Sequence, residues 1–88
     1  MPFPQQELEL KALAADRIRR KLLPARPPKS VWAGPGSGER CSLCDRTIDK
    51  LDTEYELDAP VARANGVVRL HLRCHTLWQV ELARLSEL

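Results

Sequence analysis

The sequence predicts a small α+β domain stabilised by a metal: a cysteine knuckle, a β-hairpin and a C-terminal helix, preceded by an N-terminal helix. Two short motifs, C-x2-C at Cys41 and Cys44 and H-x2-C at His71 and Cys74, lie on either side of a segment with strand patterning. Helical periodicity is present near both ends of the chain. With 88 residues and only one Phe, one Tyr and two Trp, the hydrophobic core is expected to be small, so a bound metal is expected to contribute to stability.

Residues 5–23 are predicted to form an amphipathic helix. Its apolar residues recur at helical spacing and make one stripe: Leu10, Leu13, Ala14, Ile18 and Leu22. Acidic residues come early and basic residues late, which suits the helix dipole. Pro24 is expected to end the helix. We therefore take residues 1–23 as an N-terminal helical arm.

Residues 24–40 are predicted to be an irregular connector, because the segment is rich in proline and glycine. Its only bulky apolar residues are Val31 and Trp32, and Trp32 is expected to be the point where the connector contacts the folded part. The stretch "GPGSGER" has the outward look of a phosphate-binding loop. No predicted strand precedes it, however, and Arg40-Cys41 stands where such a loop needs Lys followed by Ser or Thr.

Residues 41–88 are predicted to form the main domain, in the order knuckle, strand, strand and helix. "CSLCDRTI" suits a tight turn, "TEYELDA" alternates acidic with apolar residues, and "ANG" is a hairpin signal before "VVRLH". In that second strand we expect Val68 and Leu70 on one face and Val67 and Arg69 on the other. From residue 72 the pattern becomes helical. The apolar face and its flanks are Cys74, Trp78, Leu82 and Leu85, with Leu77 and Val80 beside them.

The two cysteine and histidine motifs together predict a zinc site. Structural zinc takes four tetrahedral ligands drawn from thiolate and imidazole. C-x2-C closes a turn around one edge of that tetrahedron, and His71 and Cys74, three residues apart where the helix starts, meet on one side. We favour Cys41, Cys44, His71 and Cys74, because a thiolate is the stronger ligand. His75, four residues after His71, leaves open a set in which it replaces Cys74 or His71.

Other chemistries of paired cysteines fit less well. Three cysteines cannot all form disulfides, and a redox C-x2-C works in a βαβ setting that the pattern lacks. A c-type haem needs His directly after the second cysteine, where this chain has Asp45. Four good ligands close the zinc shell, and no acid/base pair or nucleophile motif is visible. We therefore expect structural zinc and no enzymatic activity.

Charge is distributed unevenly along the chain, whose net charge is +2. Residues 1–40 hold eight Lys and Arg against four Asp and Glu, whereas residues 41–88 hold six against eight. The basic segment 17–29 is the candidate site for a polyanion such as DNA, although a solvated helix face explains part of it equally well. Its candidate nucleic-acid-binding residues are Arg17, Arg19, Arg20, Lys21, Arg26 and Lys29.

The composition also predicts a compartment. The first residues, "MPFPQQELELK", lack the apolar core of a signal peptide, and no apolar run reaches the ~20 residues of a membrane span. We expect a cytoplasmic protein, where thiols stay reduced and close cysteine pairs bind metal more often than they form disulfides.

The motif "CSLCDRTI … VVRLHLRCHTLW" resembles zinc fingers of the treble-clef and LIM-like kind. It is also similar to fingers of the poly(ADP-ribose) polymerase type, and the segment around "VWAGPGSGERCSLC" looks like small bacterial zinc-finger proteins. The resemblance covers residues 28–80. It implies packing roles for Ile48 and Trp78 and a zinc-finger domain over residues 41–88. It implies zinc on Cys41, Cys44, His71 and Cys74.

The resemblance and the charge lead to two functional hypotheses. Fingers of the polymerase type bind DNA, but residues 41–88 with bound zinc carry about −3, which repels phosphate. LIM-type fingers bind proteins, which suits this charge better. We therefore predict a regulatory protein-interaction module, with a protein partner or self-association through the amphipathic helices. DNA binding through residues 17–29 is the alternative.

Overall fold

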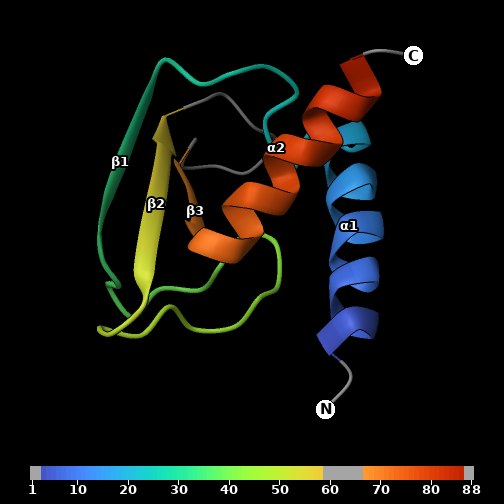
Figure 1. Ribbon diagram of the computed structural model, residues 1–88. Helices are drawn as coiled ribbons and strands as arrows, with labels where there is room; N and C mark the ends of the chain where they lie inside the picture. The colour runs from blue at the N-terminus through green and yellow to red at the C-terminus, as the bar shows by residue number, and fades with distance from the viewer. Residues whose placement is uncertain (1–2, 59–66, 87–88) are drawn as a thin grey trace.

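The computed structural model describes residues 3–58 and 67–86 (Figure 1). Its elements are α1 (Phe3–Arg19), β1 (Ser30–Pro35), β2 (Thr53–Asp58), β3 (Val67–His71) and α2 (Leu72–Ser86). The strands form an antiparallel sheet in the order β1-β2-β3. Helix α2 contacts β2 and β3, and α1 packs on α2 on the side away from the sheet. The small α+β fold with a helix at each end is thus as the sequence predicts.

Helix α1 ends at Arg19, so the prediction that it runs to residue 23 and stops at Pro24 is wrong. The chain turns at Lys21, whose φ of 62° lies in the left-handed region. The Lys21 N–H donates to the Ile18 carbonyl (3.1 Å) and the Leu22 N–H to the Arg17 carbonyl (2.8 Å). These two bonds define a Schellman cap. The turn buries Leu23 fully and leaves Leu22, a predicted stripe residue, only half-buried.

Replacing Lys21 by Gly is expected to raise the unfolding free energy by about 1 kcal/mol, because glycine adopts this φ without the clash that a Cβ causes. Thermal or urea unfolding measures the gain. Lys21→Ala removes the same charge but keeps the Cβ, so it serves as the matched control and should show no such gain. Equal stabilities of the two variants would contradict the explanation.

The connector contains a strand, contrary to the prediction of irregular chain. β1 pairs with β2 from Ser30 opposite Asp58 to Pro35 opposite Thr53. Its sequence has weak strand propensity, and main-chain pairing along β2 supplies the bonds instead. Trp32 does not anchor the segment through its side chain, which is 54% exposed.

The β2–β3 pair has the two faces expected from alternation. Val68 and Leu70 are buried with Leu57 of β2, while Val67 and Arg69 are only partly buried. The "ANG" hairpin signal lies outside the described residues. The buried face of the sheet meets α2 and positions the start of that helix next to the end of β3.

The apolar stripes of the two helices cover each other within one chain. Leu10, Leu13 and Ala14 of α1 join the same cluster as Trp78 and Leu82 of α2. Trp78 is buried, and its indole N–H donates to the Pro24 carbonyl at 2.9 Å. Ile48 is fully buried as well, so both residues implied to have packing roles do pack. The predicted flanking residue Val80 remains 48% exposed.

Candidate metal centre

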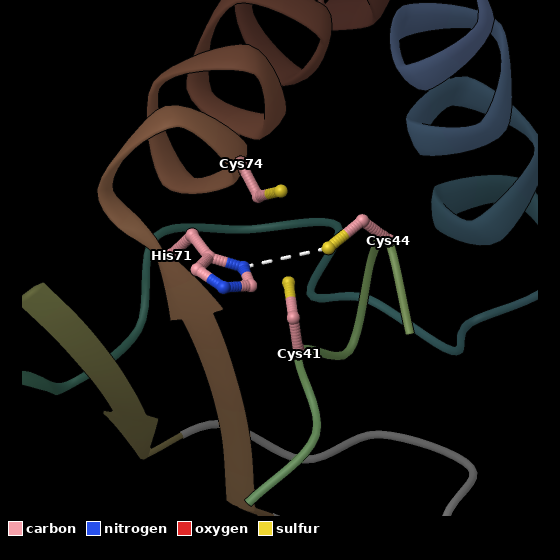
Figure 2. A group of neighbouring side chains, drawn as sticks. All are labelled: Cys41, Cys44, His71 and Cys74. Carbon is pink, nitrogen blue, oxygen red and sulfur yellow. Dashed lines mark hydrogen bonds between the residues drawn. The ribbon is translucent and has the colours of Figure 1, made fainter. Parts of the chain in front are cut away.

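Three parts of the chain bring four ligand side chains together (Figure 2). Cys41 and Cys44 come from the turn before β2, His71 ends β3, and Cys74 lies in the first turn of α2. One ligand atom from each of the four lies within 4.8 Å of all the others. This group could hold a metal ion, and it contains the four residues favoured from the sequence.

Main-chain hydrogen bonds shape the cysteine turn. The Asp45 N–H donates to the Cys41 carbonyl (3.0 Å), and the Cys41 N–H donates to the Arg46 carbonyl (2.9 Å). Asp45 has a φ of 68°, a left-handed conformation that Asp tolerates better than most residues. The Leu43 N–H points at Cys41 Sγ at 3.4 Å. The sulfurs of Cys41 and Cys44 both face the four-residue cluster. The Leu43 amide stabilises negative charge on the Cys41 sulfur.

The glycine-rich stretch before the turn is held against the loop that follows it. The Gly36 N–H donates to the Asp52 carbonyl and the Gly38 N–H to the Ile48 carbonyl, each at 3.0 Å. Arg40 and Thr47 form a further antiparallel bridge. Because these glycine amides are occupied by carbonyls, they are not available to surround a phosphate.

The His71 ring is oriented for binding through Nδ1. Its Nε2 lies 3.2 Å from the Thr47 carbonyl, and since a carbonyl only accepts, the ring proton is on Nε2. The Asp52 carboxylate lies 3.7 Å from the same nitrogen. Nδ1 then presents its lone pair toward Cys44 Sγ, 3.4 Å away. A second hydrogen bond that orients the ring is a usual companion of a histidine ligand.

The three thiols compete for negative charge. Hydrogen bonds, first from Cys44 and then from Cys74, hold the pKa of Cys41 far below its ordinary value. The hydrogen bond to Cys41 raises the pKa of Cys44. Hydrogen bonds to Cys41 and then Cys44 raise the pKa of Cys74 strongly, and burial adds to this. A divalent cation removes the competition, since it deprotonates every thiol that coordinates it.

His75 lies outside this cluster. Its ring is buried and stacks on Tyr55 with centroids 4.2 Å apart and planes 10° apart, and Trp78 lies 5.7 Å away. Burial lowers the pKa of His75, so the ring is neutral at physiological pH. The structure thus favours Cys74 over His75 as the fourth ligand, and it gives His75 a packing role instead.

Substituting each histidine by Asn separates the two roles. His71→Asn is expected to lower zinc content well below one ion per chain, because Asn reaches less far and is a poorer ligand. His75→Asn is expected to keep one zinc per chain while losing about 1–2 kcal/mol of stability with the Tyr55 stack. Elemental analysis of dialysed protein measures the first quantity and urea unfolding the second. Zinc loss in His75→Asn but not in His71→Asn would show that His75 is the ligand and that His71 has the packing role.

A groove of about 560 Å³ lies beside the centre. Cys44, His71 and Cys74 line it together with Leu10 and Leu72 and with side chains of the 46–53 loop. Cys44 is the most accessible of the three cysteines, being half-buried where Cys41 and Cys74 are buried. The groove reaches the cluster from one side, and the cluster itself offers four ligand atoms from the protein.

The basic residues of segment 17–29 differ in their contacts and exposure. Arg17 donates to the Ser42 carbonyl and so ties α1 to the cysteine turn. Arg20 pairs with Asp16 at 3.3 Å. The remaining candidate nucleic-acid-binding residues are exposed: Arg19, Lys21, Arg26 and Lys29.

The sheet carries a buried polar cluster around Glu54 that was not predicted from the sequence. Glu54 is buried, and its Oε1 accepts hydrogen bonds from the Ser37 N–H (2.9 Å) and hydroxyl (2.7 Å). Arg69 lies between Glu54 and Glu56, at 3.4 and 3.8 Å. The alternation of acids along β2 was visible, but which acid is buried depends on the loop that covers it.

Comparison of the chain with protein-family models, curated proteins and solved structures finds no match. The likeness to treble-clef and related fingers therefore rests on the ligand motif. No helix among the described residues is long and apolar enough to cross a membrane. The functional assignment depends on the centre itself.

Proposed function

We propose that this chain is a small zinc-finger protein whose zinc is structural, and that it acts as a non-enzymatic, regulatory protein-interaction module. The observation that carries the proposal is the Cys3His cluster with its ligand atoms within 4.8 Å of one another. Catalytic zinc keeps a coordination position for water, whereas four protein donors fill the shell. Three thiolates and one imidazole are a set that structural zinc commonly uses.

The distances suit zinc. Zn–S and Zn–N bonds of about 2.3 and 2.0–2.1 Å place a sulfur and a nitrogen about 3.5 Å apart at two corners of a tetrahedron. Cys44 Sγ and His71 Nδ1 are 3.4 Å apart. Thiolates also disfavour Mg²⁺ and Ca²⁺, which prefer oxygen ligands. The site residues we propose as zinc ligands are Cys41, Cys44, His71 and Cys74.

Cobalt substitution tests whether the shell is closed. The Co²⁺-loaded chain is expected to show the intense visible absorption of a tetrahedral thiolate-rich site, with one ion bound per chain. Added azide or cyanide should leave that spectrum unchanged, because no position is open to an exogenous ligand. A spectrum that shifts with saturating azide would indicate an open site and would overturn the structural assignment.

Two features support an interaction role. Cys44 and His71 line the groove with Sγ and Nδ1 3.4 Å apart, but both belong to the four-residue cluster. A metal bound by that cluster uses the thiolate and the imidazole as ligands, so neither acts as a nucleophile or a base. The apolar helix faces are largely used within the chain, while other apolar side chains remain exposed. We infer that a partner surface lies away from the α1–α2 contact.

DNA binding is the second candidate, and the exposed cations near the end of α1 favour it. Contact with phosphates predicts affinity that falls steeply with salt and depends little on sequence. Fluorescence anisotropy with a labelled duplex at ~50 mM salt tests it. A variant with Arg19, Arg26 and Lys29 changed to Glu is the control, since all three side chains are exposed and none ties α1 to the cysteine turn as Arg17 does. No binding by the natural chain would exclude this candidate.

A further inference from the structure

β1 is an edge strand with an open side. In the part of the chain that the structure describes, β2 is its only strand neighbour, and the helices lie on the far side of the sheet from it (Figure 1). Two large apolar side chains project from it, Val31 (45% exposed) and Trp32 (54% exposed). Exposed edges with large apolar residues pair readily with another strand.

The register shows which main-chain groups face outward. Gly36 lies at the end of the β1–β2 ladder and donates its N–H to the Asp52 carbonyl. Since hydrogen-bonding direction alternates along an antiparallel strand, Trp32 and Gly34 also point their main-chain groups toward β2. Val31 and Ala33 then point theirs to the open side. Pro35 shares that direction, and its missing N–H costs no bond to β2.

We propose that two copies of this chain associate by pairing β1 with β1 in antiparallel orientation, which joins the two sheets into one of six strands. This inference names the partner for the interaction role proposed above and rests on it. An antiparallel pair of identical strands is related by a two-fold axis, so one surface serves both partners. The open edge of β1 is then removed in both copies.

In one register of the β1–β1 pair, every outward-facing N–H group of β1 finds an acceptor. If Val31 of one copy lies opposite Ala33 of the other, the N–H groups of both residues in both copies find carbonyl acceptors. Trp32 then lies opposite its own counterpart at a non-hydrogen-bonded position, where side chains come closest. A register shifted by two residues toward Pro35 places a residue without an N–H in the ladder and loses a bond.

Charge favours the same orientation. Two exposed cations, Arg26 and Lys29, precede β1 in the sequence, and one exposed acid, Asp58, lies opposite Ser30 at that end. Two exposed acids, Asp49 and Asp52, and one exposed cation, Lys50, lie near the C-terminal end of β1, in the loop whose carbonyls contact Gly36. Antiparallel pairing brings the basic end of each copy toward the acidic end of the other. Complementary ends of this kind speed association and fix its direction.

The ladder is short, so the dimer is expected to be weak and reversible, because it buries less than the ~1,600 Å² of a standard interface. Sedimentation equilibrium of the full zinc-loaded chain is the test. The average mass should rise from one chain toward two between about 1 and 500 µM, the range in which small interfaces dissociate. Circular dichroism should show a tryptophan exciton couplet that grows with concentration, as facing Trp32 rings require.

Two variants and one control locate the interface. Ala33→Pro removes an outward N–H at a position where the β1–β2 bonds are untouched, and Trp32→Lys introduces facing like charges. Each should raise the dissociation constant at least tenfold and abolish the couplet. Val80→Lys changes an equally exposed apolar residue on α2 and should leave both readouts unchanged. Zinc content, measured on the same samples, reports separately on the proposed function and on folding.

Three results would overturn the inference. One is a chain that carries one zinc and stays monomeric over the whole concentration range. Another is a dimer that resists Ala33→Pro and Trp32→Lys but is lost in Val80→Lys, which would place the interface on α2. The third is a monomer whose Trp32 fluorescence responds to an added extended peptide, which would make β1 a site for a different protein.

Discussion

Cys41→Ser is expected to abolish metal binding and to leave the chain unfolded at room temperature. Cys41 is buried at the centre of the cluster, and its sulfur accepts from the Leu43 amide. Structural zinc in comparable small sites contributes about 10–16 kcal/mol of apparent binding free energy. Whole domains are stable by only about 5–15 kcal/mol. The loss of one thiolate therefore removes a contribution as large as the net stability.

Far-UV circular dichroism and elemental analysis measure the two losses together. Chelation of zinc from the natural chain should produce the same unfolded spectrum, and adding zinc back should reverse it in that chain alone. Thr47→Ser is the matched control, because it changes an exposed side chain in the same loop and keeps the carbonyl that accepts from His71. A folded, metal-free Cys41→Ser chain of ordinary stability would contradict a structural role for the metal.

The parts of the fold that were predictable are those whose own sequence carries the signal. Alternation in "VVRLH" and the spacing of Trp78 and Leu82 each follow from one buried face, so the buried faces of β3 and, apart from Val80, of α2 were predicted correctly. The ligand group was predictable for a related reason. Both motifs are local in sequence. C-x2-C places two donors on one side of a turn, and H-x2-C places two donors on one side of a helix start.

The parts that were not predictable depend on distant main-chain groups. β1 is a strand because β2 pairs with it, and its Pro- and Gly-containing sequence gives no sign of this. The end of α1 is a cap built on Lys21, a residue rarely used in a left-handed conformation. His75 is buried because Tyr55, from another element, offers a ring to stack on. In each case the structure depends on residues that are distant in the sequence, and local sequence patterns do not reveal them.

Substitution of Gly36 is expected to have the second large effect on stability. The contacts of Gly36 also show why the connector needs a glycine at this position. A Cβ built on Gly36 would lie 1.9 Å from the Asp49 carbonyl oxygen and 2.5 Å from that of Ile48. Neither main-chain atom can move easily, since Ile48 is fully buried and its N–H donates to the Glu39 carbonyl. The residue is glycine because the backbone of one loop lies directly against the other.

Gly36→Ala is therefore expected to lower the unfolding free energy by roughly 3 kcal/mol, the upper end of the cost of overpacking a close contact. Urea unfolding of the zinc-loaded chain measures it. Gly34→Ala is the matched control: a Cβ there meets nothing within 4 Å, so its effect should stay below about 1 kcal/mol. The displaced loop also carries Thr47, whose carbonyl orients His71, so Gly36→Ala should bind zinc more weakly as well. Equal stability and zinc affinity of the two alanine variants would show that the glycine-rich loop is not held against the metal-binding turn.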